Sequence, residues 1–119
     1  MKKTTITLIA GALLMIPSVS FGAAKARTFT GSIMDSQCAK MGSHDTMKQK
    51  AGIASDAECT KECVSMGGKY VLYNADTKTV YELDDQKKPE AFAGDKVKVT
   101  GTYSAKTKTI HVENIEATK

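Results

Sequence analysis

The chain has 119 residues, with 17 Lys and Arg against 13 Asp and Glu, three cysteines and no tryptophan. Beyond residue 22 the basic residues number 15 and the net charge falls to +2, with Arg27 as the single arginine. A nearly neutral chain without a stripe of lysines lacks the basic surface of a nucleic-acid-binding protein, so we predict no such partner.

Residues 1–22 are typical of a signal peptide. Lys2 and Lys3 precede an apolar run over residues 6–16, and Pro17 begins a stretch of small, helix-breaking residues. The apolar run is well short of the roughly 20 residues that span a bilayer as a helix. Small residues allow cleavage after Gly22, Ala24 or Ala26. We therefore expect residues 23–119 to form one small, soluble β-barrel domain, periplasmic or secreted, with no membrane insertion.

A first strand is predicted over residues 27–34. Phe29 and Ile33 fall on one face of this segment, and Gly31 stands where a strongly curved strand needs a residue without a side chain. Residues 35–54 show no sustained hydrophobic period, which indicates a loop with room for one helical turn. This loop carries Cys38 and His44.

A short helix is predicted over residues 56–66. Ser55 and Glu58 form a capping-box pattern at its start, and Gly67 and Gly68 supply a left-handed stop at its end. Cys59 and Cys63 are four residues apart on this helix, so both thiols project from one face.

Two hairpins follow the helix. The strands are expected at residues 69–73 and 79–83, and at residues 96–103 and 109–115. Between the hairpins, residues 89–94 suit a helical turn with Phe92 in the core. Five short strands in this order predict a mainly β fold, a small OB-like barrel in which the cysteine-bearing helix is an insertion.

Cys38, His44, Cys59 and Cys63 are the candidate metal ligands. Three thiolates and one imidazole form a donor set that suits Zn(II), and soft donors also suit Cu(I). Methionines near the loop, Met34, Met41 and Met47, offer thioether sulfurs and favour copper. The C-x5-H-x14-C-x3-C spacing is not that of a standard zinc finger.

Two other uses of the cysteines stay open. A disulfide from Cys38 to Cys59 or Cys63 would fasten the loop to the helix and leave one free thiol, whereas a Cys59–Cys63 bridge suits helix geometry poorly. Alternatively, Cys59 in the first helical turn could act in thiol redox chemistry, although the spacing differs from the usual Cys-x2-Cys.

Other polar and aromatic residues point to no catalytic constellation. His111 is expected on the solvent side of the last strand, and Asp84 and Asp85 are interpreted as solvated charges at a strand end. The four tyrosines either pack the small barrel or form a ligand-binding face. They are Tyr70, Tyr73, Tyr81 and Tyr103.

Five segments carry a resemblance to a known family: residues 31–38 (GSIMDSQC), 58–64 (ECTKECV), 68–72 (GKYVL), 80–84 (VYELD) and 92–101 (FAGDKVKVTG). Together they resemble a family of small exported bacterial domains of unknown function. The resemblance implies that the three cysteines and His44 belong to one site, but it brings no established activity. We predict an exported, non-catalytic binding domain whose partner is a copper or zinc ion or an unidentified envelope protein. A disulfide-stapled module and a thiol redox protein are the alternatives.

Overall fold

The computed structural model describes residues 25–118 of the chain. The predicted signal peptide lies outside the described residues. Within residues 25–118, no helix combines the length and apolar character that crossing a membrane requires.

Five strands form a closed barrel in the order β1-β2-β3-β5-β4. β3 and β5 pair in parallel, and every other neighbouring pair is antiparallel. The strands are β1 (Arg27–Asp35), β2 (Tyr70–Asn74), β3 (Thr79–Leu83), β4 (Lys96–Ser104) and β5 (Thr109–Ala117). Both predicted hairpins are present, and the prediction of a five-stranded, OB-like barrel is confirmed.

β1 is shared between two neighbours. It pairs with β4 over residues 27–32 and with β2 over residues 32–35, and the last pair of the second register joins Asp35 to Tyr70. At Gly31 a Cβ atom would lie 2.4 Å from the backbone oxygen of Tyr73. The close approach therefore requires glycine, as the predicted curvature of this strand suggested.

Aliphatic side chains fill the barrel. Alternate residues of β4 and β5 point inward, which follows the two-residue period of a half-buried strand. The fully buried members include Ile33, Leu72, Val97, Val99 and Ile110. The helical turn between the hairpins is the 3-10 helix η1 (Lys88–Phe92), in which Pro89 is buried. Phe92 packs against the core but is only partly buried, so its predicted role as a core plug is correct only in part.

Three helices connect β1 to β2: α1 (Ser36–Met41), α2 (Asp45–Ala51) and α3 (Asp56–Ser65). α3 is the predicted helix, and Ser55 Oγ accepts a hydrogen bond from the Glu58 N–H at its start. The prediction of a loop over residues 35–54 is wrong, because this segment forms both α1 and α2. Neither helix reaches two full turns, so no hydrophobic period could develop.

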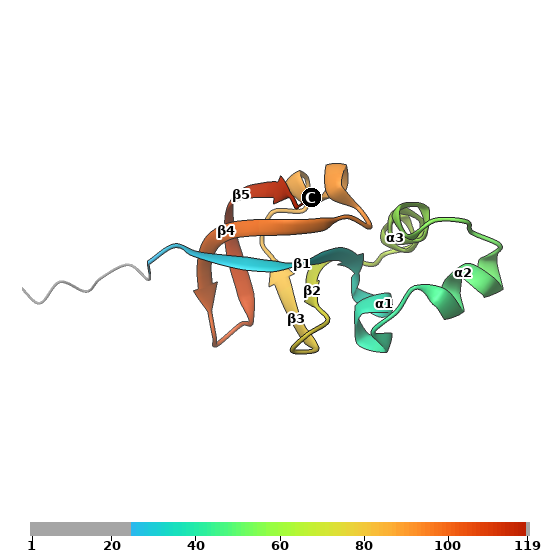
Figure 1. Cartoon of the computed structure of the whole chain (residues 1–119), viewed down its shortest axis with the longest axis horizontal. Coiled ribbons are helices and arrows are strands. Elements are labelled where there is room, and N and C mark those ends of the chain that lie inside the picture. The colour runs from blue at the N-terminus through green and yellow to red at the C-terminus, as the bar shows by residue number, and fades with distance from the viewer. Residues whose placement is uncertain (1–24, 119) are drawn as a thin grey trace, which may run out of the picture.

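The helices lie together at one end of the barrel (Figure 1), and we call residues 36–69 the helical insertion. Gly94, just after η1, has a φ of 79° and holds α3 close, because a Cβ there would lie 2.5 Å from the backbone nitrogen of Ala57. Lys48 Nζ lies 2.7 Å from Asp56 Oδ1, which joins α2 to α3. The insertion is thus fastened both to the barrel and to itself.

Candidate metal centre

The three cysteines meet inside the helical insertion. Cys38 comes from α1, whereas Cys59 and Cys63 come from the buried face of α3. Their three sulfur atoms all lie within 4.8 Å of one another, and all three are free thiols. Cys38 and Cys59 are fully buried, and Cys63 is 5% exposed. The prediction that Cys59 and Cys63 face the same way is confirmed.

A second group of donors shares Cys38. Donor atoms of Asp35, Cys38 and His44 also lie within 4.8 Å of one another. Asp35 is the last residue of β1, and His44 directly precedes α2. The structure therefore places His44 beside Cys38 and Asp35, and does not group it with Cys59 and Cys63 at that distance.

Asp35 is a site residue that the sequence analysis missed. Its Oδ2 accepts hydrogen bonds from the backbone N–H groups of Gln37 and Cys38, at 3.1 and 3.0 Å, and so caps α1. The side chain is fully buried. An Asp three residues before Cys38 was a visible capping signal, but a helix of six residues gave no periodicity to support it.

Three buried polar atoms of the described chain accept or donate no hydrogen bond: Asp35 Oδ1, His44 Nδ1 and Thr60 Oγ1. Asp35 Oδ1 and His44 Nδ1 are 4.0 Å apart, beyond hydrogen-bonding distance. Thr60 shares the buried face of α3 with the two cysteines. Leaving such an atom unsatisfied costs about 1–3 kcal/mol, and all three atoms lie in or beside the helical insertion.

Burial favours the protonated thiols of Cys38 and Cys63. It raises the pKa of the Cys38 thiol far above its ordinary value, and the Asp35 carboxylate and the Cys59 thiol raise it further. Burial also raises the pKa of Cys63 to about 11, with further contributions from Asp35 and Cys59. Thiolates would form here only with a compensating positive charge, and a metal ion supplies one.

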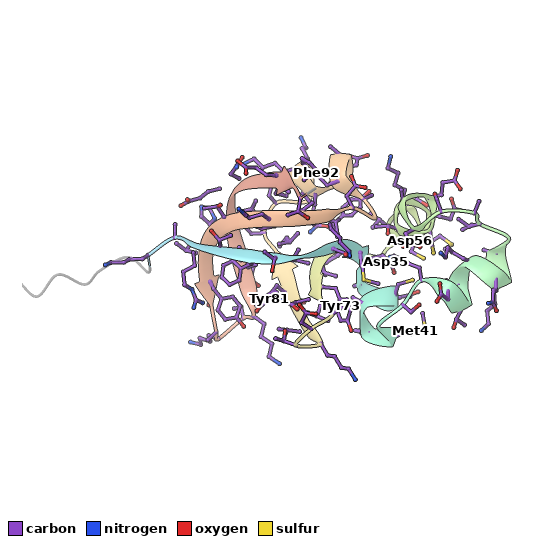
Figure 2. All side chains as sticks on the ribbon, viewed as in Figure 1. Asp35, Met41, Asp56, Tyr73, Tyr81 and Phe92 are labelled. Atoms are coloured by element: carbon purple, nitrogen blue, oxygen red, sulfur yellow. The ribbon has the colours of Figure 1, made fainter. Side chains whose placement is uncertain are left out.

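Apolar residues surround the thiols. Met34, Ala39 and Val71 are buried with the cysteines, and Met47 and Ile53 pack against them. Met41, by contrast, is half exposed. Figure 2 shows sulfur atoms between the labelled Asp35 and Asp56, with Met41 at the outer edge of the insertion. Of the three methionines noted in the sequence, two therefore line the cluster.

His111 belongs to neither donor group. Its side chain is exposed, as predicted, but its Nδ1 contacts Asp84 Oδ2, and Asp84 Oδ1 accepts a hydrogen bond from the Val112 N–H at 2.9 Å. Asp85 Oδ1 accepts hydrogen bonds from the N–H groups of Lys87 and Lys88. The interpretation of the two aspartates as solvated charges is incomplete, because both side chains are partly exposed but also accept hydrogen bonds from neighbouring backbone.

The tyrosines serve packing. Tyr70 is buried in the barrel, and Tyr73 packs against the thiol cluster. Tyr81 and Tyr103 surround Phe29, with ring centroids 5.2 and 5.9 Å from that of Phe29. Three of the tyrosines thus pack on the barrel core and Tyr73 packs on the thiol cluster, which supports the packing interpretation.

The fold and the site together define a class: a small barrel with a thiol-rich helical insertion. Residues 63–118 match the model of a family described as a protein of unknown function (DUF5818). This confirms the resemblance to a family of unknown function over the C-terminal part of the chain. Of the predicted ligands the match includes Cys63 alone. No curated protein and no solved structure matches the chain.

Proposed function

We propose that this chain is an exported, non-catalytic binding domain that holds a soft metal ion, Cu(I) or Zn(II), in its helical insertion. Cys38, Cys59 and Cys63 supply the thiolates, and His44 is the fourth candidate ligand. The observation that carries the proposal is the convergence of three buried thiols beside the free buried atoms of Asp35 and His44.

A purely structural role explains this cluster less well. Three cysteines could pack as small apolar residues, since free cysteines are often buried. Capping of α1 accounts for one oxygen of the Asp35 carboxylate, but a purely structural core leaves Asp35 Oδ1 and His44 Nδ1 unsatisfied, and each such atom lowers stability. A bound cation would offset part of the negative charge that the thiolates and the carboxylate bring.

The donor set leaves copper and zinc to be separated by experiment. Three sulfurs with Met34 and Met47 packed nearby form a soft environment, which favours Cu(I). Zn(II) prefers four ligands in a tetrahedron, and His44 would have to move toward Cys59 and Cys63 to complete such a set.

A disulfide-stapled interaction module is the second candidate. The observation that favours it is the proximity of Cys38 to both cysteines of α3. A bridge from Cys38 to α3 would fasten α1 and contribute about 3 kcal/mol for a loop of this length. The structure favours the thiol redox alternative less, because a reactive cysteine needs exposure, and all three thiols are buried, with burial raising the pKa of Cys38 and Cys63.

Export and a periplasmic or secreted location are part of the proposal, and the N-terminal sequence pattern supports them. The test begins with the protein purified from the periplasm without chelator or reductant. We expect a native mass in excess of the polypeptide mass by bound metal, and three alkylated cysteines after denaturation. A Cys63→Ser variant should lose metal, whereas His111→Ala, outside the cluster, should keep it. One alkylated cysteine without metal would instead establish the disulfide.

A further inference from the structure

We propose that the helical insertion binds two metal ions that share Cys38 as a bridging ligand. One ion occupies a trithiolate subsite of Cys38, Cys59 and Cys63, and the other occupies a mixed subsite of Asp35, Cys38 and His44. This inference rests on the proposed function and assigns Asp35 to the site. The ligand class it names is a pair of divalent ions such as Zn(II).

The donor atoms form two groups that share one residue. Each set of three has all its donor atoms within 4.8 Å, and Cys38 is the single residue common to both. His44 and Asp35 do not join the other two cysteines at that distance. A single ion bound by the three sulfurs would therefore not be coordinated by Asp35 and His44.

The mixed subsite contains two unsatisfied polar atoms. Asp35 Oδ1 and His44 Nδ1 are buried, and neither has a hydrogen-bond partner among residues 25–118. Their separation of 4.0 Å is too long for a hydrogen bond. Two atoms bound to one tetrahedral Zn(II) by bonds of about 2.0–2.2 Å lie roughly 3.4 Å apart, so the two atoms must approach each other by about half an ångström to share one ion.

The negative charge of the donors also favours two ions. With all groups ionised, the three thiolates and the Asp35 carboxylate bring four negative charges into a region where these residues are at most 5% exposed. One divalent ion leaves two of these charges uncompensated, and buried uncompensated charge is strongly unfavourable. Two divalent ions bring the total to zero with His44 neutral.

The two subsites differ in the type of their donors. Three thiolates form a soft subsite, whereas carboxylate, imidazole and thiolate form a subsite of mixed hardness. Zn(II) and its spectroscopic substitute Cd(II) accept both donor sets. The two subsites should therefore give distinguishable signals with the same metal.

The test uses the reduced, chelator-treated protein without its signal peptide, titrated with Cd(II) and followed by native mass and cadmium NMR. We expect two ions per chain and two cadmium resonances, the more sulfur-rich one at lower field. Asp35→Asn retains an oxygen that can cap α1, and His44→Gln replaces a side chain that makes no cap hydrogen bond. Each should reduce binding to one ion and retain the trithiolate resonance. The control Asp45→Asn, a highly exposed carboxylate next to His44, should keep two.

The outcomes separate this inference from the proposed function. One ion in the wild type, unchanged in Asp35→Asn and His44→Gln, would overturn the two-ion site and leave the soft-metal site standing. Absence of any bound Cd(II) in the folded wild type would overturn both. If Asp35→Asn fails to fold, His44→Gln decides alone: a fall from two ions to one supports the mixed subsite, and no change refutes it.

Discussion

The β-barrel and the helical insertion bury different chemistry. The barrel interior consists of aliphatic and aromatic side chains, whereas the insertion buries three thiols with Asp35, His44 and Thr60. Every buried side-chain polar atom without a hydrogen-bond partner in the described chain belongs to the second group. The barrel can therefore stabilise itself by apolar burial, whereas under the proposed function a bound ion would satisfy atoms in the interior of the insertion.

The helices sharpen this contrast. α1 has six residues and α2 has seven, and α2 buries none of them. Helices this short are unstable on their own in water. Their order depends on the Asp35 cap, on the Lys48–Asp56 ion pair and on the cluster that they enclose.

The largest expected effect is on the stability of the barrel core. Leu72 is fully buried in the barrel core, so Leu72→Ala should lower the free energy of unfolding by about 2–5 kcal/mol. Urea denaturation measures the change. Met66→Ala, at a residue that is 68% exposed, is the control and should stay within about 0.5 kcal/mol of the wild type. A loss below 1 kcal/mol for Leu72→Ala would contradict a barrel stabilised by its core.

The next prediction concerns the contact between the barrel and the helical insertion at Gly94. Gly94→Ala forces a side chain into a left-handed backbone position and against the backbone of Ala57. We expect a loss of about 2–4 kcal/mol, from backbone strain and from overpacking. Relative to the wild type, the variant should show a larger increase in amide hydrogen exchange in α3 than in β4. Equal protection of both elements would show that this contact does not hold the insertion in place.

Metal removal tests the dependence of the insertion on its ligand. Binding stabilises the folded state by about 2.7 kcal/mol when the free ion is at roughly 100 times Kd. Chelation should therefore lower Tm and speed amide exchange over residues 36–65, with β4 and β5 little changed. Loss of protection spread evenly over barrel and insertion would contradict the comparison.

The smallest expected effect lies on the barrel surface. Desolvation opposes the shift, but the Val112 N–H and the His111 ring hold the pKa of Asp84 below its ordinary value. The contribution to stability is then present above the unfolded-state pKa and is lost as pH falls through the lower folded-state pKa. Acid titration of stability should be shallower in Asp84→Asn than in the wild type. Identical acid profiles would show that the Asp84 carboxylate adds nothing to the acid dependence of stability.

The barrel was predictable because its signals are local. The alternation of Val97 and Val99 with lysines, and the turn residues between strands, specify the hairpins directly. Pairing of Asp84 with His111 was missed because it depends on β3 and β5 meeting at barrel closure, 27 residues apart.

The candidate site was predictable only in part. The four-residue spacing of Cys59 and Cys63 indicated a shared face, since α3 is long enough to be recognised. The position of His44 beside Asp35 depends on the turn between α1 and α2, and short helices leave no periodic signal. The sequence therefore suggested the soft donors and missed the carboxylate.

The pairing of Asp35 with Tyr70 has a consequence for how such a protein can change. The chain leaves the barrel at one position and returns at its hydrogen-bonded neighbour, where the Ser36 N–H also donates to the Lys69 oxygen at 2.9 Å. A segment with adjacent ends is a cassette, because a tight hairpin turn can close the same gap. The barrel can therefore keep its strand pairing while the cassette is exchanged or shortened, provided that the replacement covers Met34 and Val71, the strand residues buried against the cysteines.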